Sequence, residues 1–256
     1  MKAAVFMEPG KVEIHDVPKP IIDGDNQAII RVVRASVCGS DLWWYRGIAK
    51  RQANSLVGHE AIGVVESVSD DVDRIKPGDF VIVPFTHGCG HCVACLNGFE
   101  GNCLNQKPGT NGGYQAEFMK YEPANSGLVK IPGTPADYTA DQLASLQTLS
   151  DVMATGFHAA KSAEVKEGDT VAVIGRVGVP QTEPKSNQLF WKNVGLRGGI
   201  ASVTKPDKEV LLQAVLDGKI NPGKVFTKSF SLDDIQSAYQ AMDKREAIKS
   251  LLIVSE

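Results

Sequence analysis

The 256-residue sequence has no long apolar run and no excess of basic residues. No apolar stretch approaches the roughly 18 residues that a membrane-spanning helix needs, so we expect no membrane partner. The formal net charge of −3 provides no basic field, and we therefore expect no nucleic-acid partner. The Pro9-Gly10 pair interrupts the N-terminal stretch too early for a signal peptide, which predicts a cytoplasmic protein.

Cysteine is absent from the whole chain beyond Cys103, and all five cysteines fall between Cys38 and Cys103. A secreted protein stabilised by disulfides would spread an even number of cysteines more widely. An odd number concentrated in one segment instead indicates metal binding. We therefore expect a metal-binding protein rather than a disulfide-bonded one.

The first 135 residues have the pattern of an all-β domain. Val12 and Ile14 alternate with polar residues after the Pro9-Gly10 turn, which predicts a hairpin with the apolar segment before it. Apolar runs predict further strands at residues 28–35, 61–68 and 80–84. Many short strands joined by glycine and proline turns indicate a barrel or a sandwich.

The pattern changes near residue 139. Thr139 and Gln142 have the spacing of a capping box, which predicts the start of a helical stretch that continues toward Ala163. Residues 170–175 are apolar and follow a Gly-Asp pair, which is typical of a buried strand in a parallel sheet.

Two further helices and a strand are predicted in the last part of the chain. An apolar stripe that includes Val210 and Leu211 predicts a helix ending at Gly218, and Ile235 begins a second stripe at helical spacing. Residues 249–254 predict a closing strand. The predicted fold class is therefore α/β with a β-rich part.

A cluster of four cysteines carries the sharpest chemical signal. Its members are Cys89, Cys92, Cys95 and Cys103. Four thiolates at such short spacing can close a tetrahedron around zinc, and a site closed by four protein ligands is structural. Free or disulfide-bonded cysteines and an iron–sulfur cluster are the alternatives for this pattern.

The fifth cysteine indicates a second candidate site. His59 lies farther along the chain than Cys38 and is a second candidate ligand. A catalytic zinc needs three protein ligands and one exchangeable water. Thiolate and imidazole are two of the ligand types that such a site uses. Taken alone, Cys38 also fits a small buried core residue and His59 a core histidine.

These motifs together resemble the zinc-dependent medium-chain alcohol dehydrogenases. The resemblance rests on Cys-Gly-Ser-Asp at 38–41, Gly-His-Glu-Ala-Ile-Gly-Val-Val at 58–65, Lys-Pro-Gly-Asp-Phe-Val at 76–81 and the four-cysteine segment. Their order and spacing match over about residues 1–175. The resemblance implies a GroES-like β-barrel catalytic domain combined with a doubly wound, or Rossmann, coenzyme domain.

The resemblance also implies roles for individual residues. The implied ligands of a catalytic zinc are Cys38, His59 and Asp151. Glu60 would be a nearby carboxylate that can approach the metal, and Asp41 would hold the tautomer of His59. Ser40 would relay the proton of the substrate.

The implied chemistry is hydride transfer between a small uncharged alcohol, aldehyde or ketone and a nicotinamide coenzyme, NAD or NADP. Zinc would polarise the substrate oxygen, and two zinc ions per chain are expected. Trp43 and Trp44 follow the metal cysteine and would narrow an apolar substrate pocket. Relatives of this kind are usually homo-oligomers.

The sequence departs from the family where the coenzyme should bind. The apolar run ending at Gly175 is not followed by the glycine-rich turn that cradles a pyrophosphate. The family pattern resumes at Arg176. The resemblance therefore implies that a segment of the coenzyme domain is missing between Gly175 and Arg176. Gly178 and Val179 resemble positions beside the nicotinamide, and Lys249 resembles a basic residue that meets the pyrophosphate.

We therefore predict three parts. Residues 1–150 would form the GroES-like catalytic domain, with the structural zinc lobe at 88–104. Residues 151–204 would form the remnant of the Rossmann domain, and residues 205–256 would return to the catalytic domain. The predicted function is a zinc-dependent alcohol dehydrogenase, and the alternative is a coenzyme-free zinc-binding module without dehydrogenase activity.

Overall fold

The computed structural model describes residues 1–105, 112–169 and 204–255. A small sheet has the strand order β2-β1-β4, with bounds Lys2–Glu8 for β1, Lys11–Asp16 for β2 and Ser55–Leu56 for β4. The predicted hairpin is confirmed, because β1 and β2 pair antiparallel around a turn at Gly10, whose φ of +83° suits glycine. The predicted strand at 170–175 lies outside the described residues.

A larger sheet of seven strands forms the centre of the described structure, in the order β8-β6-β5-β3-β10-β9 with β7 also paired to β3. Its strands are β3 (Ala28–Ser36), β5 (Ala61–Val68), β6 (Phe80–Val83), β7 (Phe118–Tyr121), β8 (Val129–Ile131), β9 (Phe226–Ser231) and β10 (Lys249–Ile253). Strands from the two ends of the chain therefore pair directly, β10 antiparallel to β3.

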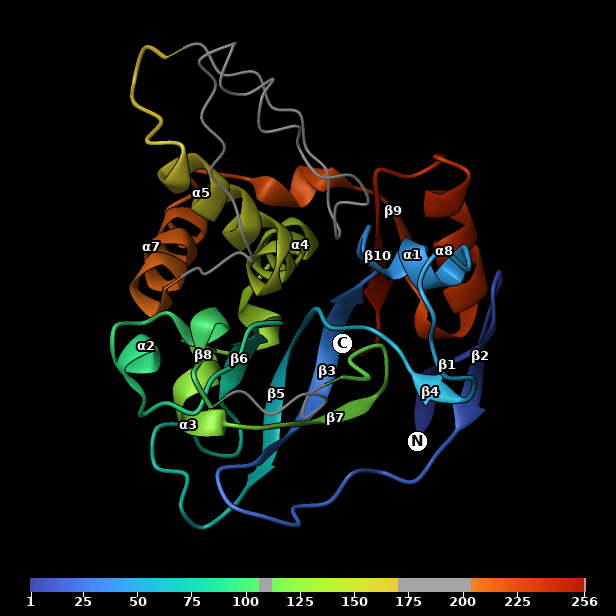
Figure 1. Ribbon diagram of the computed structural model, residues 1–256, viewed down its shortest axis with the longest axis horizontal. Helices are drawn as coiled ribbons and strands as arrows, with labels where there is room; N and C mark the ends of the chain where they lie inside the picture. The colour runs from blue at the N-terminus through green and yellow to red at the C-terminus, as the bar shows by residue number, and fades with distance from the viewer. Residues whose placement is uncertain (106–111, 170–203, 256) are drawn as a thin grey trace, which may run out of the picture.

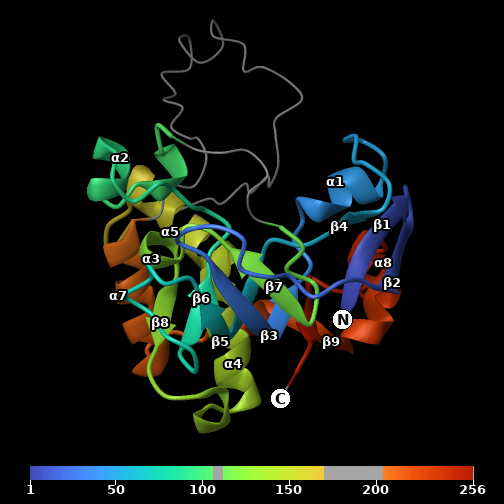
Figure 2. The same cartoon turned by 90° about the horizontal axis from the view of Figure 1, so that it is seen from below.

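Helices flank this sheet in two groups (Figures 1 and 2). One group is α4 (Ala140–Gln147), α5 (Val152–Ser162) and α7 (Lys205–Leu216); the other is α1 (Asp41–Tyr45) and α8 (Ile235–Asp243), beside the hairpin. Two further short helices are α2 (Val93–Leu96) and α3 (Ala124–Gly127). The expectation that the first 135 residues are all-β is therefore corrected by α1, α2 and α3, each of one turn or little more.

Two apolar clusters hold these elements together. One joins the hairpin, β3 and α8, and includes Phe6, Val32 and Tyr239. The other packs α4 and α7 on β5, β6 and β8, and includes Phe80 and Leu146. The α/β class with a β-rich part is confirmed, whereas the domain boundaries at 150 and 205 stay predictions.

The predicted helix from residue 139 toward Ala163 begins as expected but is interrupted. Thr139 and Gln142 form the capping box of α4. The chain then makes a 3-10 turn, η3 (Thr148–Ser150), and Asp151 has φ −151° and ψ −77°, outside the helical region. The side chain of Asp151 accepts a hydrogen bond of 2.8 Å from the Thr155 hydroxyl of α5. The helical stretch toward Ala163 is therefore present, and the break divides it into α4 and α5.

The apolar stripe predicted for α7 is shifted by one position. Lys208, Leu211, Leu212 and Val215 are buried, but Val210 is 59% exposed. Leu212 replaces Val210 on the buried face because α7 packs on α4 and β8 at an angle that the sequence pattern does not fix. Gly218 follows the helix with φ +68°, as predicted for its end.

Candidate metal sites

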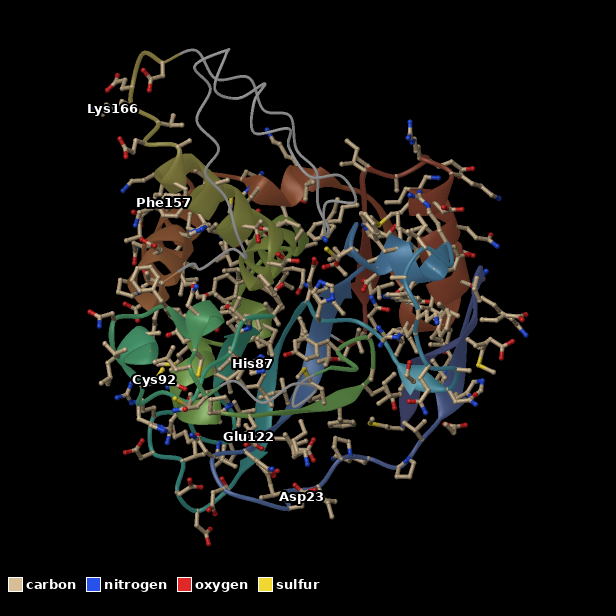
Figure 3. The ribbon with its side chains drawn as sticks, viewed as in Figure 1. Asp23, His87, Cys92, Glu122, Phe157 and Lys166 are labelled. Atoms are coloured by element: carbon tan, nitrogen blue, oxygen red, sulfur yellow. The ribbon has the colours of Figure 1, made fainter. Side chains whose placement is uncertain are left out.

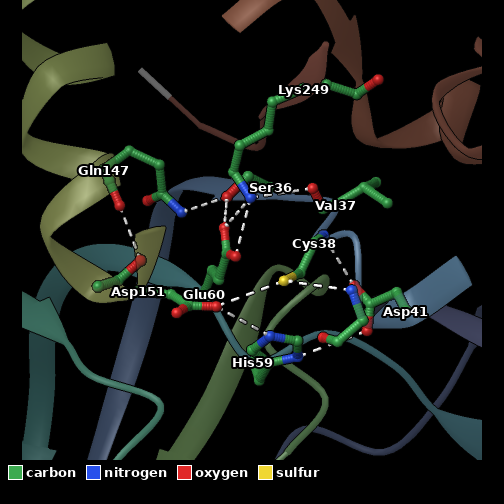
Figure 4. A network of polar contacts seen from close by, with 12 residues as sticks. Ser36, Val37, Cys38, Asp41, His59, Glu60, Gln147, Asp151 and Lys249 are labelled. Carbon is green, nitrogen blue, oxygen red and sulfur yellow. Dashed lines mark hydrogen bonds and ion pairs between the residues drawn. The ribbon is translucent and has the colours of Figure 1, made fainter. Parts of the chain in front are cut away.

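Three candidate ligands from distant parts of the chain come together in the structure. Cys38 lies between β3 and α1, His59 lies just before β5, and Asp151 lies in the break between α4 and α5. Cys38 Sγ and His59 Nε2 each lie 3.4 Å from Asp151 Oδ2. With Glu60 they form what we call the mixed cluster, whose ligand atoms lie within 4.8 Å of one another (Figure 4).

The spacing and chemistry of these donors fit zinc. Bonds of about 2.0–2.3 Å to a tetrahedral zinc place neighbouring ligand atoms about 3.3–3.8 Å apart. The separations of 3.4 Å that end on Asp151 fall in this range. Thiolate sulfur, imidazole nitrogen and carboxylate oxygen are the donor types that zinc prefers, and three of them leave a fourth position for another ligand.

Asp41 orients the imidazole of His59. Asp41 Oδ1 lies 3.4 Å from His59 Nδ1, and the other oxygen of Asp41 accepts a hydrogen bond of 3.0 Å from the backbone N–H of Cys38. Asp41 is buried, so its position is fixed by these contacts. A carboxylate at Nδ1 keeps a proton there, so a metal bound to His59 would replace the proton on Nε2, the nitrogen that faces Asp151.

The groups of the mixed cluster shift one another's protonation. Burial raises the pKa of the Cys38 thiol to about 11, and Glu60 adds to this rise. Burial alone would lower the pKa of His59, but Asp41 and Asp151 raise it well above its ordinary value. Burial raises the pKa of Asp151, yet His59 outweighs this and the net shift is downward. Metal binding would remove the Cys38 proton, because the thiolate is the ligand form.

Glu60 is fully buried and faces a lysine. Lys249 Nζ donates to Glu60 Oε1 at 2.8 Å and lies 2.7 Å from Oε2, while the Ser36 hydroxyl also donates to Oε2. Figure 4 shows Lys249 and Ser36 on one side of the Glu60 carboxylate and His59 on the other. Burial raises the pKa of Glu60 and Lys249 opposes the rise, with a net upward shift.

The four remaining cysteines form a second cluster, which we call the thiolate lobe. Cys92 Sγ lies 3.5 Å from Cys95 Sγ and 4.0 Å from Cys103 Sγ, and Cys89 Sγ lies 4.0 Å from Cys95 Sγ. Four sulfurs around zinc would be about 3.8 Å apart, so these separations fit. A Cβ on Gly88 would stand 2.6 Å from Cys95 Sγ, so glycine is needed there.

The thiolate lobe lies at the edge of the molecule, where Cys92 is labelled in Figure 3, and His87 lies farther inward. His87 and His91 are not part of the group of possible ligands, and His91 Nδ1 lies 2.9 Å from the carbonyl oxygen of Cys89. The lobe is tied to α7, since Lys208 Nζ lies 3.8 Å from the carboxylate of Glu100 and both side chains are buried.

The sequence matches known proteins over the part that contains both clusters. Residues 24–133 match the alcohol dehydrogenase GroES-like domain. An uncharacterized zinc-type alcohol dehydrogenase-like protein of Bacillus subtilis is 37% identical over 190 residues, which is 68% of this chain and 49% of that protein. A glutathione-independent formaldehyde dehydrogenase of Pseudomonas aeruginosa is 32% identical over 217 residues, which is 78% of this chain and 54% of that protein. This chain belongs to the zinc-dependent medium-chain alcohol dehydrogenase family.

Solved structures of alcohol dehydrogenases share the fold. The alcohol dehydrogenase TADH from Thermus sp. ATN1 superposes with a TM-score of 0.80 at 20% identity, with all of both chains covered. An alcohol dehydrogenase from Aeropyrum pernix superposes with a TM-score of 0.79 at 22% identity, over 99% of this chain and all of that one. The chain spans about half the length of the curated dehydrogenases that it matches. Both clusters hold donor types that zinc uses in proteins.

One of the two tryptophans predicted for the substrate pocket lies elsewhere. Trp44 is 7% exposed and packs in the core, with its ring centroid 5.1 Å from that of Phe6 and 5.4 Å from that of Tyr239. Its assignment to the pocket is wrong, because adjacent helical residues face different directions. Trp43 is half-buried, and its place in a pocket stays a prediction, as does the proton relay by the half-buried Ser40.

The residues predicted to bind the coenzyme have a different outcome. Gly178 and Val179 lie outside the described residues. Lys249 is buried, and its ammonium contacts Glu60 and the carbonyl oxygen of Val37 rather than facing outward. Sequence reasoning missed Ser36 and Gln147, which also belong to this buried network. No local sequence signal marks both residues, because their contacts join β3 to α4.

Among the described residues, no helix is both long enough and apolar enough to cross a membrane.

Proposed function

We propose that the mixed cluster binds a catalytic zinc and that the protein interconverts small uncharged alcohols and the corresponding aldehydes or ketones with NAD or NADP. The observation that carries the proposal is the convergence of Cys38, His59 and Asp151 within bonding range of one ion. Zinc supplies polarisation of the substrate oxygen when it is bound. Relatives named zinc-type alcohol dehydrogenase-like protein and formaldehyde dehydrogenase support this class of substrate.

The protein's own residues would orient that chemistry. Asp41 keeps His59 in the tautomer that binds through Nε2. Ser40 is the N-cap of α1, two residues after Cys38, and its backbone N–H lies 3.5 Å from Cys38 Sγ. We propose that its hydroxyl accepts the proton of the alcohol and passes it toward solvent.

We propose a structural zinc for the thiolate lobe and therefore two zinc ions per chain. Four cysteine ligands leave no position for a substrate, so this ion would only stabilise the lobe. Metal analysis of the purified protein tests the pair of sites. Two equivalents of zinc support them, and one or none would contradict the two-site proposal.

The decisive assay follows the absorbance of reduced nicotinamide with an alcohol series and both coenzymes. We expect turnover with at least one pair, and we expect Cys38→Ser to abolish it. The matched control is Val37→Ala, which changes the neighbouring buried residue but keeps the thiolate. Full activity of Cys38→Ser would contradict the catalytic assignment.

A coenzyme-free zinc module is the second candidate, and one specific observation favours it. Gly175 is followed by Arg-Val-Gly-Val-Pro rather than by a glycine-rich turn. A fluorescence titration with NADH and NADPH separates the two candidates. Micromolar binding supports the dehydrogenase, and no binding up to millimolar coenzyme supports the module.

A further inference from the structure

The carboxylate of Glu60 has an unusual position, because it belongs to the mixed cluster and is also held by two residues outside it. Its ligand atom lies within 4.8 Å of those of Cys38, His59 and Asp151. Both of its oxygens contact Lys249 Nζ, and Oε2 also accepts from the Ser36 hydroxyl. Glu60 is therefore a potential ligand that other residues keep engaged.

The Ser36 hydroxyl is itself oriented. Gln147 Nε2, from the last residue of α4, donates to Ser36 Oγ at 2.9 Å. A hydroxyl that accepts a hydrogen bond on its lone pair still has one proton to donate, and here that proton goes to Glu60. Ser36 and Gln147 are both fully buried, so water does not compete for these contacts.

The charges around the mixed cluster show why the contacts of Glu60 matter for a bound zinc. The thiolate of Cys38 and the carboxylate of Asp151 together balance the two positive charges of the ion. Glu60 and Lys249 balance each other across 2.7 Å. A Glu60 carboxylate released from its partners would be a buried anion beside a divalent cation, and it would take the fourth ligand position.

We propose that Ser36, oriented by Gln147, is a positioning residue that keeps the Glu60 carboxylate on Lys249 and away from the metal. This inference rests on the proposed function, since it concerns the open position of the same zinc site. It assigns a role to Ser36 on β3 and Gln147 on α4, neither of which binds the metal itself.

The test replaces zinc with Co²⁺, whose visible absorption reports its ligands, and titrates the full-length protein with imidazole as an added ligand. The signal of the mixed cluster is the difference from the same protein carrying Cys38→Ser, because the thiolate lobe also binds cobalt. In Ser36→Ala we expect imidazole to bind roughly tenfold more weakly, the scale of one hydrogen bond to a charged group. We expect the cobalt spectrum without imidazole to change as well.

A double-mutant cycle identifies Glu60 as the residue through which Ser36 acts. In a Glu60→Gln background, Ser36→Ala should no longer alter imidazole affinity, because the amide is a poor ligand for the metal. Gln147→Met is a second variant that keeps side-chain length, and it should weaken imidazole binding in the same direction. The matched control is Ser250→Ala, which removes another buried hydroxyl, one that donates to the carbonyl oxygen of Ala238.

Each outcome decides one question. Unchanged imidazole affinity and an unchanged spectrum in Ser36→Ala would overturn the positioning role, as would an effect that persists in the Glu60→Gln background. An equal effect of Ser250→Ala would reduce the result to general destabilisation and also overturn it. If the unmodified protein gives no cobalt signal that depends on Cys38, the proposed function fails instead.

Discussion

The two cysteine clusters of this molecule place the same side chain in opposite environments. Cys38 is buried among carboxylates, and burial raises the pKa of its thiol to about 11. Cys89 is half-buried at the edge of the molecule. Burial raises the pKa of its thiol, but backbone and side-chain donors from His91 and Asn105 outweigh this and lower the pKa to about 5. Cys38 therefore depends on a metal to become a thiolate, whereas Cys89 is a thiolate before the metal arrives.

This difference separates two uses of a metal ion. The thiolate lobe is built from one short segment, so an ion there would close a loop within that segment. The mixed cluster is built from β3, β5 and the break between α4 and α5, which are held by the surrounding sheet and helices. We expect the first ion to contribute folding energy and the second to contribute chemistry.

The largest expected effect concerns thiol reactivity in the metal-free protein. At pH 7 a pKa of about 5 leaves Cys89 almost fully ionised, whereas a pKa of about 11 leaves Cys38 about 0.01% ionised. Peptide mapping after timed iodoacetamide treatment should show rapid labelling of Cys89 that is constant above about pH 6, and slow labelling of Cys38 that rises up to tenfold per pH unit. Equal labelling rates of Cys89 and Cys38 in the folded protein would contradict this difference in pKa. As a control, the two cysteines should be labelled at equal rates in guanidinium.

The next largest effect concerns stability. Cys103→Ser should remove one zinc and lower the free energy of unfolding by several kcal/mol, because structural zinc ions bind with about 10–16 kcal/mol in small zinc domains. Cys38→Ser should remove the other zinc and the turnover while keeping most of the stability. Metal analysis and thermal unfolding with and without a chelator measure both. Comparable losses of stability in the two variants would mean that both ions are structural.

A smaller effect is expected from the residue that orients His59. Asp41→Asn should weaken zinc binding at the mixed cluster about 10–100-fold, as loss of such supporting carboxylates does elsewhere. Competition with a zinc chelator gives the affinity. The exposed Asp141→Asn is the control, and the affinity of the thiolate lobe should not change in either variant. A lobe that weakened in Asp41→Asn would show that the clusters are not independent.

The smallest expected effect comes from a variant that changes the stability of the protein and neither metal cluster. Thr139 caps α4 through its hydroxyl, which accepts from the backbone N–H of Gln142 at 3.2 Å. Thr139→Ala should cost about 1 kcal/mol of unfolding free energy, measured by denaturant titration, and both zinc ions should stay bound. Loss of either zinc in this variant would show that metal content follows global stability, which would weaken the readouts above.

Local patterns made part of this structure predictable. The hairpin around Gly10, the capping box at Thr139 and the four-cysteine spacing each depend on residues close in sequence, so the sequence alone contained the relevant geometry. The mixed cluster joins three distant segments, and its composition came from family resemblance rather than from spacing. Its predicted roles await the experiments above.

The parts that were missed depend on tertiary packing. Trp44 turned into the core because α1 directs consecutive side chains apart. The helix break at Asp151 has no glycine or proline to announce it. The partnership of Ser36 and Lys249 with Glu60 requires the pairing of β10 with β3, which no local pattern reveals.

The pairing of β10 with β3 also fixes the order in which the protein can mature. Lys249 reaches the carbonyl oxygen of Val37 across 212 residues of chain. On a ribosome, β3 would leave the exit tunnel long before β10 is synthesised, and a chain grows at about 5–20 residues per second. The neighbourhood of Glu60 would therefore stay incomplete for more than about ten seconds, during which a nascent chain could capture zinc with Glu60 still unrestrained.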